Sequence, residues 1–105
     1  MIAAQFIFEP GEYDDEFHRL DDSIDNDAKS LPGFLGTDRW VSVDGLRINA
    51  VYYFDDMSAL TKLGRFDDHR TAKSQVDRWY KGYRVIVTEV TATYGNMRHI
   101  AAGDA

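Results

Sequence analysis

Residues 42–80, SVDGLRINAVYYFDDMSALTKLGRFDDHRTAKSQVDRWY, decide the fold that the sequence predicts. Asp44-Gly45 lies between two runs that alternate as β-strands do, and this dipeptide favours a hairpin because both positions tolerate positive φ. In the run 46–54, one strand face carries only apolar or aromatic side chains: Leu46, Ile48, Ala50, Tyr52 and Phe54. This part of the stretch therefore predicts two antiparallel strands joined by a turn.

The rest of the stretch predicts a helix that is interrupted near Gly64. Asp55 and Asp56 offer capping oxygens, and apolar residues at helical spacing follow over 57–63. Gly64 then weakens the helix. A second helical start at 67–68 aligns one stripe of side chains: His69, Ala72, Val76 and Trp79 or Tyr80. The unit is therefore strand, turn, strand and broken helix.

The remaining segments complete a ferredoxin-like pattern. Residues 2–9, 34–43 and 83–94 alternate as strands, and residues 12–29 form an amphipathic helix with an acidic outer face that Leu31-Pro32-Gly33 ends. The order β-α-β-β-α-β predicts an α+β fold, a four-stranded antiparallel sheet with two helices on one face. We expect one domain over 1–94, followed by a C-terminal tail over 95–105.

One face of such a sheet has no helix to cover it. We expect five apolar side chains on that bare side: Val41, Val51, Tyr53, Val85 and Val87. A second copy of the sheet is the simplest cover, which predicts a homodimer with a two-sheet or barrel-like interface, a dimeric α/β barrel.

Composition narrows the classes of partner. A chain of 105 residues with a formal net charge of −6 lacks the basic face of a nucleic-acid binder and is disfavoured at anionic membranes. No cysteine is present to form a disulfide or act as a thiolate nucleophile. The apolar run 1–8 has no basic segment before it and ends at Glu9-Pro10-Gly11, too early for a signal peptide. We therefore expect a soluble, cytoplasmic protein.

Several short motifs in chain order resemble one known family. They are Pro32-Gly33-Phe34-Leu35, Asp44-Gly45, Tyr52-Tyr53-Phe54-Asp55-Asp56, Ala59-Leu60, His69, Ala72, Arg78-Trp79-Tyr80, Tyr83, Val85, Val87, Glu89-Val90 and Tyr94. In this order and spacing the chain resembles the antibiotic biosynthesis monooxygenase domain family, which belongs to a dimeric α/β-barrel group. That group also contains quinol-forming monooxygenases and haem-degrading oxygenases.

The chain departs from this family at two positions. Many members have a tryptophan in the first part of the second helix, where this chain has Leu63. Members that oxidise aromatic polyketides or degrade haem use an asparagine together with that tryptophan, and the first strand here offers only Gln5. Haem degradation by the known Asn/Trp/His triad is therefore not expected.

The resemblance implies oxygenation of a small aromatic or quinol substrate without metal, flavin or other cofactor. We predict His69 as the base that deprotonates the substrate. Trp40 and Phe66 are predicted pocket walls, Arg39 or Asn49 is predicted to hold a substrate oxygen, and Tyr53 completes the predicted binding set. The structural alternative for His69 is a local bond to Asp67, Asp68 or a backbone carbonyl.

Two other functions stay open at this point. His69 is also a possible haem ligand, which predicts a haem-binding or haem-degrading relative. The third hypothesis is a non-catalytic dimeric ligand-binding or stress-associated protein. We predict no metal site, because adjacent carboxylates such as 14–16 point in different directions on a helix and are usually solvated.

Overall fold

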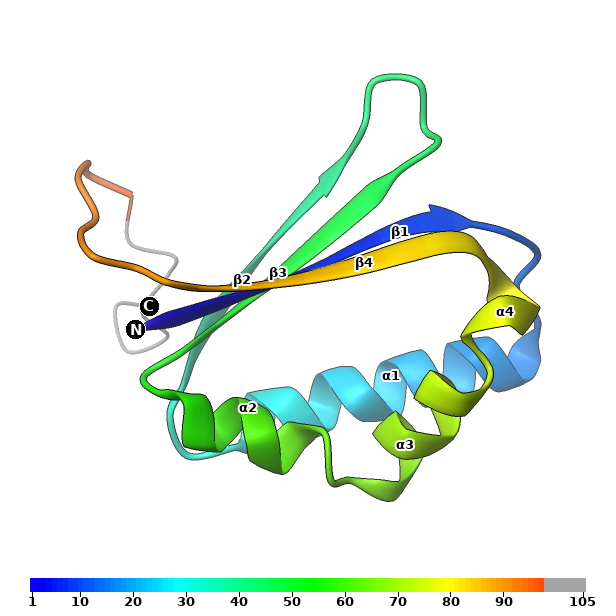
Figure 1. Cartoon of the computed structure of the whole chain (residues 1–105), viewed down its shortest axis with the longest axis horizontal. Helices are drawn as coiled ribbons and strands as arrows, with labels where there is room; N and C mark the ends of the chain where they lie inside the picture. The colour runs from blue at the N-terminus through cyan, green and yellow to red at the C-terminus, as the bar shows by residue number, and fades with distance from the viewer. Residues whose placement is uncertain (98–105) are drawn as a thin grey trace.

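The computed structural model describes residues 1–97 and has one sheet and one layer of helices (Figure 1). The four strands are ordered β2-β3-β1-β4 and all neighbours are antiparallel, as the ferredoxin-like prediction requires. The predicted second helix is divided into three segments. In chain order the elements are β1 (Ile2–Pro10), α1 (Asp15–Ser30), β2 (Phe34–Val41), β3 (Ile48–Phe54), α2 (Met57–Leu63), α3 (Asp67–Ser74), α4 (Val76–Trp79) and β4 (Tyr80–Glu89).

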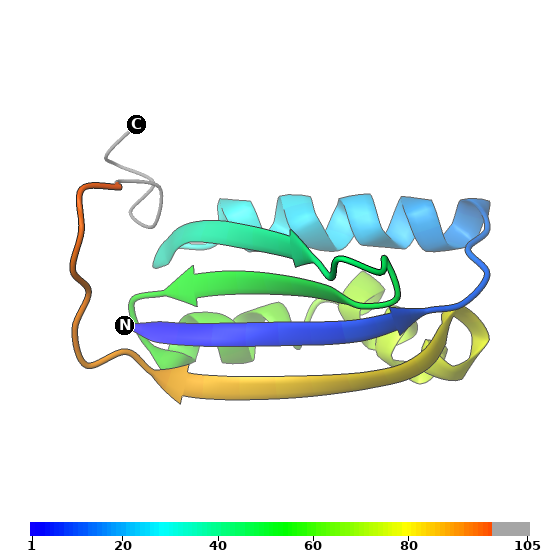
Figure 2. The ribbon, with the colours of Figure 1, turned by 90° about the horizontal axis from the view of Figure 1, so that it is seen from above.

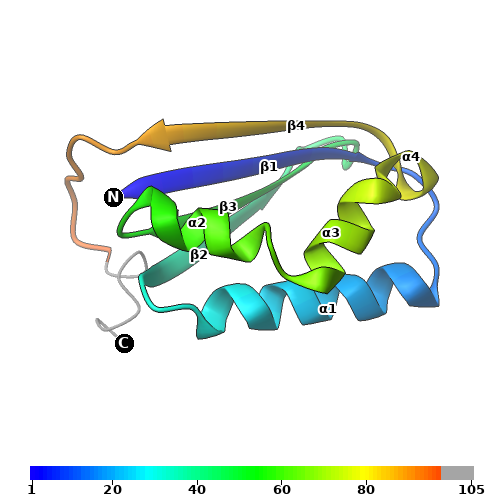
Figure 3. The ribbon, with the colours of Figure 1, turned by 60° about the horizontal axis from the view of Figure 1, so that its bottom comes forward.

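All the helices lie on one side of the sheet (Figures 1 and 2). Seen from the helix side, α1 runs roughly parallel to the row formed by α2 and α3 (Figure 3). We call the side under the helices the helix side and the other the open face. Among the described residues, no helix is long and apolar enough to cross a bilayer. The predicted tail at 95–105 extends mostly beyond the described residues, and the domain boundary stays a prediction.

The core lies between the helices and the sheet and has two centres. One joins α1, β3 and α2 through Ala28, Phe54, Ala59 and Leu63. The other joins α1 and α4 through Phe17, Leu20 and Trp79. The largest fully buried side chains, Trp79, Phe54, Leu20 and Leu63, all belong to these centres. Apolar burial therefore stabilises mainly the helix side, where both core centres lie.

A polar clamp holds the start of α1 against α4. Asp14 is the N-cap of α1, and its carboxylate accepts hydrogen bonds from the backbone N–H of Phe17 at 2.8 Å and from the Trp79 indole at 3.1 Å. Arg78 donates to Asp14 at 2.6 Å and to Glu16 at 2.9 Å, and its guanidinium lies 5.2 Å from the Trp79 ring centre. The clamp therefore fixes the buried indole between the two helices.

Strand register decides which side chains face the helices. Directly paired residues of an antiparallel ladder share one side of the sheet. Tyr52 reaches α1, where its hydroxyl donates to Asp25 at 3.0 Å, so Tyr52 and its row lie on the helix side. Val51 and Tyr53 consequently lie on the open face, as predicted.

The prediction that Val41, Val85 and Val87 lie on the open face is wrong. Val41 pairs with Ile48, Val85 with Phe6 and Val87 with Ala4, and these partners all belong to the helix side. The two β4 valines are still 45% and 43% exposed, because β4 is an edge strand that few helical side chains reach. Their apolar character therefore did not reveal their side.

Two local features set the register of β2 and β3. The hairpin exists, but its turn spans Ser42 to Arg47, and only Gly45 has positive φ, at 75°. Asp44 accepts hydrogen bonds from Ser42 and from the backbone N–H of Leu46, which holds this wider turn. An irregularity between Phe34 and Gly36 then puts Phe34 on the helix side and Gly36 on the open face.

Two leucines provide a matched test of where the core lies. Leu63 is 1% exposed and Leu46 is 65% exposed. We expect Leu63→Ala to lower the free energy of unfolding by about 2–5 kcal/mol, because it leaves a cavity in the core. Leu46→Ala should change it by no more than about 0.5 kcal/mol. Urea denaturation measures both, and equal losses in the two variants would contradict this core.

Candidate functional site

A cluster of ionisable and aromatic side chains lies on the helix side, and we call it the helix-side cluster. Its members come from four different elements or their flanks: Tyr13, Asp21, Arg39, Tyr52 and Tyr80. The Arg39 charge acts on all four of the other members. The fold therefore brings three phenols, a carboxyl group and a guanidinium close together.

Ring contacts hold the tyrosines of the cluster in place. Tyr80 stacks on Phe8 with ring centres 4.2 Å apart and meets Tyr13 edge-on at 5.9 Å. Tyr52 meets Phe6 edge-on at 5.8 Å. Such contacts fix ring orientation, while the hydroxyl ends serve as polar handles, as the Tyr52 hydroxyl does when it donates to Asp25. The cluster is thus a rigid aromatic surface with hydroxyl groups on it.

Burial and charge act in opposite directions within the cluster. Burial raises the pKa of the Tyr13, Tyr52 and Tyr80 phenols, and the Arg39 charge partly opposes this rise. Burial also raises the pKa of the Asp21 carboxyl group, which Arg39 again opposes. The phenols therefore stay protonated donors at neutral pH, while Arg39 supplies a positive charge that an oxyanion would prefer.

His69 lies one helical turn before Ala72, which packs against the Phe17, Leu20 and Trp79 centre. This spacing puts the imidazole on the inner side of α3. Its Nδ1 atom is buried and has no hydrogen-bond partner among the described residues. Burial lowers the pKa of His69, and the Lys73 charge lowers it further. The imidazole is therefore neutral at pH 7.

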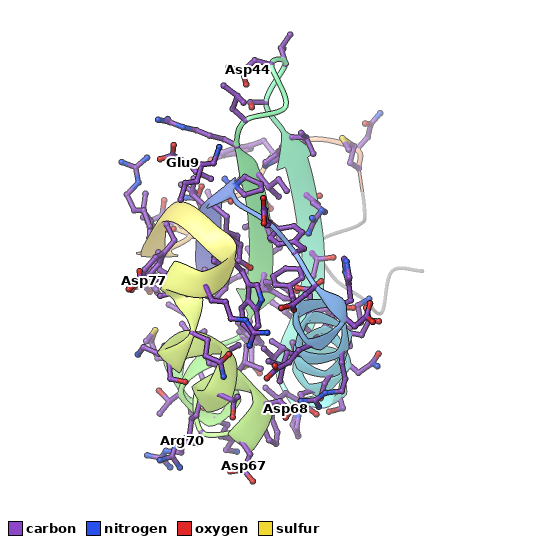
Figure 4. All side chains as sticks on the ribbon, turned by 90° about the vertical axis from the view of Figure 1, so that its right-hand side faces the viewer. Glu9, Asp44, Asp67, Asp68, Arg70 and Asp77 are labelled. Atoms are coloured by element: carbon purple, nitrogen blue, oxygen red, sulfur yellow. The ribbon has the colours of Figure 1, made fainter. Side chains whose placement is uncertain are left out.

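Within residues 1–97, the Nδ1 atom of His69 bonds neither to Asp67 or Asp68 nor to a backbone carbonyl, which was the structural alternative for this residue. Asp68 instead accepts a hydrogen bond from Ser23 of α1 at 2.6 Å and lies 3.7 Å from Arg19. Asp67 and Arg70 point away from the helix layer (Figure 4). The acidic residues beside His69 thus tie α3 to α1 or face solvent, and they leave the imidazole without a carboxylate partner.

The six predicted site residues do not form one pocket. Phe66 packs against the Phe54 and Leu63 centre on the helix side, where Arg39 also lies. Trp40, Asn49 and Tyr53 lie on the open face: Trp40 pairs with Asn49, whose amide donates to Gln5, and the Tyr53 hydroxyl donates to Asp38. The prediction that Trp40 and Phe66 are walls of one cleft is therefore wrong, because Trp40 lies on the open face and Phe66 on the helix side. Trp40 is separated from its neighbour Arg39 in the same way, because adjacent strand residues point to opposite sides.

Arg39 alone among the members of the helix-side cluster was predicted as a site residue, because Tyr52 and Tyr80 looked like core positions. Tyr13 looked like one of the apolar residues of an amphipathic helix, and Asp21 like one of many solvated acids in α1. Their proximity to Arg39 depends on how α1 packs across the sheet, and no local pattern records that. Within residues 1–97, no three His, Cys, Asp or Glu side chains converge as a metal site would require.

Comparison with known proteins rests on structure alone, because no family model and no curated protein matches the sequence. Rv0793 from Mycobacterium tuberculosis is similar with a TM-score of 0.72 at 17% identity, covering 90% of this chain and 98% of that chain. SnoaB, a cofactor-independent oxygenase from Streptomyces nogalater, has a TM-score of 0.71 at 10% identity, covering 90% of this chain and 97% of that one.

A third similar structure carries the family name. The putative antibiotic biosynthesis monooxygenase from Nitrosomonas europaea has a TM-score of 0.68 at 12% identity, covering 88% of this chain and 100% of that chain. At these identities the likeness establishes the fold and leaves the chemistry to be argued from the site. The chain therefore has the fold of the antibiotic biosynthesis monooxygenase structures.

Proposed function

We propose that this protein is a cofactor-independent oxygenase of a small phenol or quinol, with His69 as its general base. One observation carries the proposal: the inner, half-buried imidazole has a buried Nδ1 without a partner among the described residues. A neutral, unpaired imidazole can accept a proton, whereas a structural histidine normally has its nitrogens bonded. The fold shared with SnoaB, named a cofactor-independent oxygenase, supports the same class of reaction.

The proposed chemistry begins with proton transfer to His69. The substrate hydroxyl group, or an acidic C–H beside its carbonyl group, gives its proton to the His69 imidazole and becomes an electron-rich anion. That anion itself supplies the electrons that reduce dioxygen, so the protein has only to bind, deprotonate and shield it from water. Phe66 and the neighbouring apolar core would provide that shielding.

Arg39 is assigned to a second oxygen of the substrate. The Lys73 charge shifts the pKa of His69, whereas the Arg39 charge shifts the pKa values of the helix-side cluster. His69 and Arg39 therefore serve different ends of a ligand. Quinols and polycyclic phenols carry oxygens at opposite ends, which fits this separation. Trp40, Asn49 and Tyr53 lie on the open face and have no part in this proposal.

The proton affinity of His69 gives a direct test of its environment. We expect its pKa, measured by NMR titration of the imidazole, to lie below the ordinary value of about 6.5. Lys73→Gln should raise it, because one opposing charge is removed, and Lys62→Gln on α2 should not. Because the unfolded chain binds the His69 proton more readily than the folded chain does, the free energy of unfolding should fall as pH drops through about 6.5. His69→Gln should make this fall smaller.

Activity tests the base itself. With an anthrone or quinol as substrate and an oxygen electrode as readout, His69→Ala should lower the turnover number by about 100-fold or more. Arg70→Ala, one residue further on the outer side of α3, should keep wild-type turnover. Equal rates of oxygen uptake by His69→Ala and by the wild type would reject His69 as the general base. A hemin Soret shift that His69→Ala abolishes would assign the imidazole to iron instead.

We also propose that a second copy covers part of the open face, as a homodimer. The rows nearest the start of β1 contain four apolar or aromatic side chains, Ala3, Val51, Tyr53 and Ile86, beside the polar Gln5, Asp38 and Thr88. Ala3 and Val51 are already buried, but Ile86 and Tyr53 are only partly covered. A matching sheet would remove this remaining apolar surface from water.

Sedimentation equilibrium tests the homodimer. We expect twice the chain mass for the wild type and a single-chain mass for Ile86→Arg, because an unpaired guanidinium would be buried at the interface. Thr61→Arg adds the same charge on exposed α2 and should leave the dimer intact. A wild type that sediments as a single chain at the highest concentration would rule the dimer out.

A further inference from the structure

The end of the open face near the β2–β3 turn differs from the rest of that face. One transverse row crosses all four strands: Trp40 pairs with Asn49, Asn49 with Ile7 and Ile7 with Arg84. The next row contains Arg47 and the pair Glu9 and Gly82. Glu9 lies at this end of the sheet, below the turn that carries Asp44 (Figure 4). This end therefore carries three charged side chains, Glu9, Arg47 and Arg84, whereas the rows proposed for the dimer carry one, Asp38.

Two shallow hollows open at this end. One, of about 250 Å³, is lined by Ile7, Glu9, Arg47, Gly82 and Arg84 among others. The second, of about 230 Å³, is lined by Trp40, Ser42, Asn49, Ile7 and Arg47 among others. Because Ile7 and Arg47 belong to both, the hollows are neighbours. Their size suits a ligand of one or two rings.

The two arginines of this site are available for a ligand. Arg47 and Arg84 are exposed, and their guanidinium groups make no hydrogen bond or ion pair with other side chains among residues 1–97, whereas Arg78 and Lys29 are engaged by carboxylates. Glu9 is the acidic neighbour, and its Oε1 lies over Gly82, where a side chain would crowd it. The lining of the larger hollow thus carries two positive charges and one negative, and the Asp44 carboxylate in the turn also interacts with Arg47, so the site suits an anion with no more than a single charge.

An apolar surface lies beside these charges. Trp40 is 57% exposed, and the side chain of Ile7 forms a floor shared by both hollows. An exposed indole offers a flat face on which an aromatic ring stacks. Guanidinium groups bind carboxylates through paired, charge-assisted hydrogen bonds.

We propose that this end of the open face is a binding site for an aromatic carboxylate, with its ring on Trp40 and its carboxylate between Arg47 and Arg84. The site is independent of the proposed oxygenase chemistry, which lies on the other side of the sheet. Asn49 and Ser42 border the ring position, and Glu9 limits the charge that the site accepts.

The probe for this site is 2-naphthoate, followed by NMR of the Trp40 indole and by fluorescence. Trp79 is buried on the helix side and serves as the internal reference. We expect saturable shifts of the Trp40 signal, with Arg47→Gln and Arg84→Gln each weakening binding about tenfold, as loss of a charge-assisted bond of about 1.4 kcal/mol would give. The uncharged analogue 2-naphthamide should bind the wild type about as weakly as 2-naphthoate binds the arginine variants.

Two further variants sharpen the test. Glu9→Gln removes the opposing charge and should tighten binding several-fold, whereas Arg70→Gln on α3 should leave it unchanged. Binding that is equal in the wild type and both arginine variants would overturn the proposal. So would a Trp40 signal that ignores 2-naphthoate but moves with protein concentration, because this end would then belong to the contact between two copies.

Discussion

A four-stranded sheet with helices on only one side imposes the constraint on which the rest of this molecule depends. Trp79, Phe54, Leu20 and Leu63 are buried between the sheet and the helices, and both core centres among residues 1–97 lie on that side. Because side chains alternate along a strand, one step in sequence moves a residue from one environment to the other. Arg39 and Trp40 are neighbours in sequence and therefore belong to different sites.

Much of the architecture could be predicted from local pattern. Alternation identified all four strands, helical spacing identified α1 and the broken second helix, and Gly64 marked the interruption. Sheet order followed from the order of these elements, since a ferredoxin-like connection leaves few alternatives. The two sides of β3 were also correct, because its apolar face is unmixed.

The sides of β2 and β4 could not be predicted in the same way. Both strands carry apolar side chains on both faces and neither face of β2 is cleanly polar, so their orientation depends on register with their neighbours. The irregularity before Gly36 sets that register for β2, and the pairing of β1 with β4 sets it for Val85 and Val87. The prediction of the site was affected most, because the pocket predicted from Trp40 and Phe66 combined residues from opposite sides of the sheet.

The two sides of the sheet also divide the proposed functions. On the helix side, burial keeps His69 neutral and unpaired, and the phenols around Arg39 stay protonated. These are conditions for accepting a proton and for holding an oxyanion. On the open face, an apolar half suits a second copy, and a charged end with an exposed indole suits a small anion. Fold similarity alone distinguishes none of these roles.

The most direct measurement of this two-sided arrangement is a NOESY spectrum with assigned side chains. We predict cross-peaks from the Trp40 indole to Ile7 and Asn49, and from the Arg39 side chain to the Tyr52 or Tyr80 ring. Cross-peaks from Trp40 to Phe66 or Tyr52 would contradict the arrangement, because they would put Trp40 under the helices.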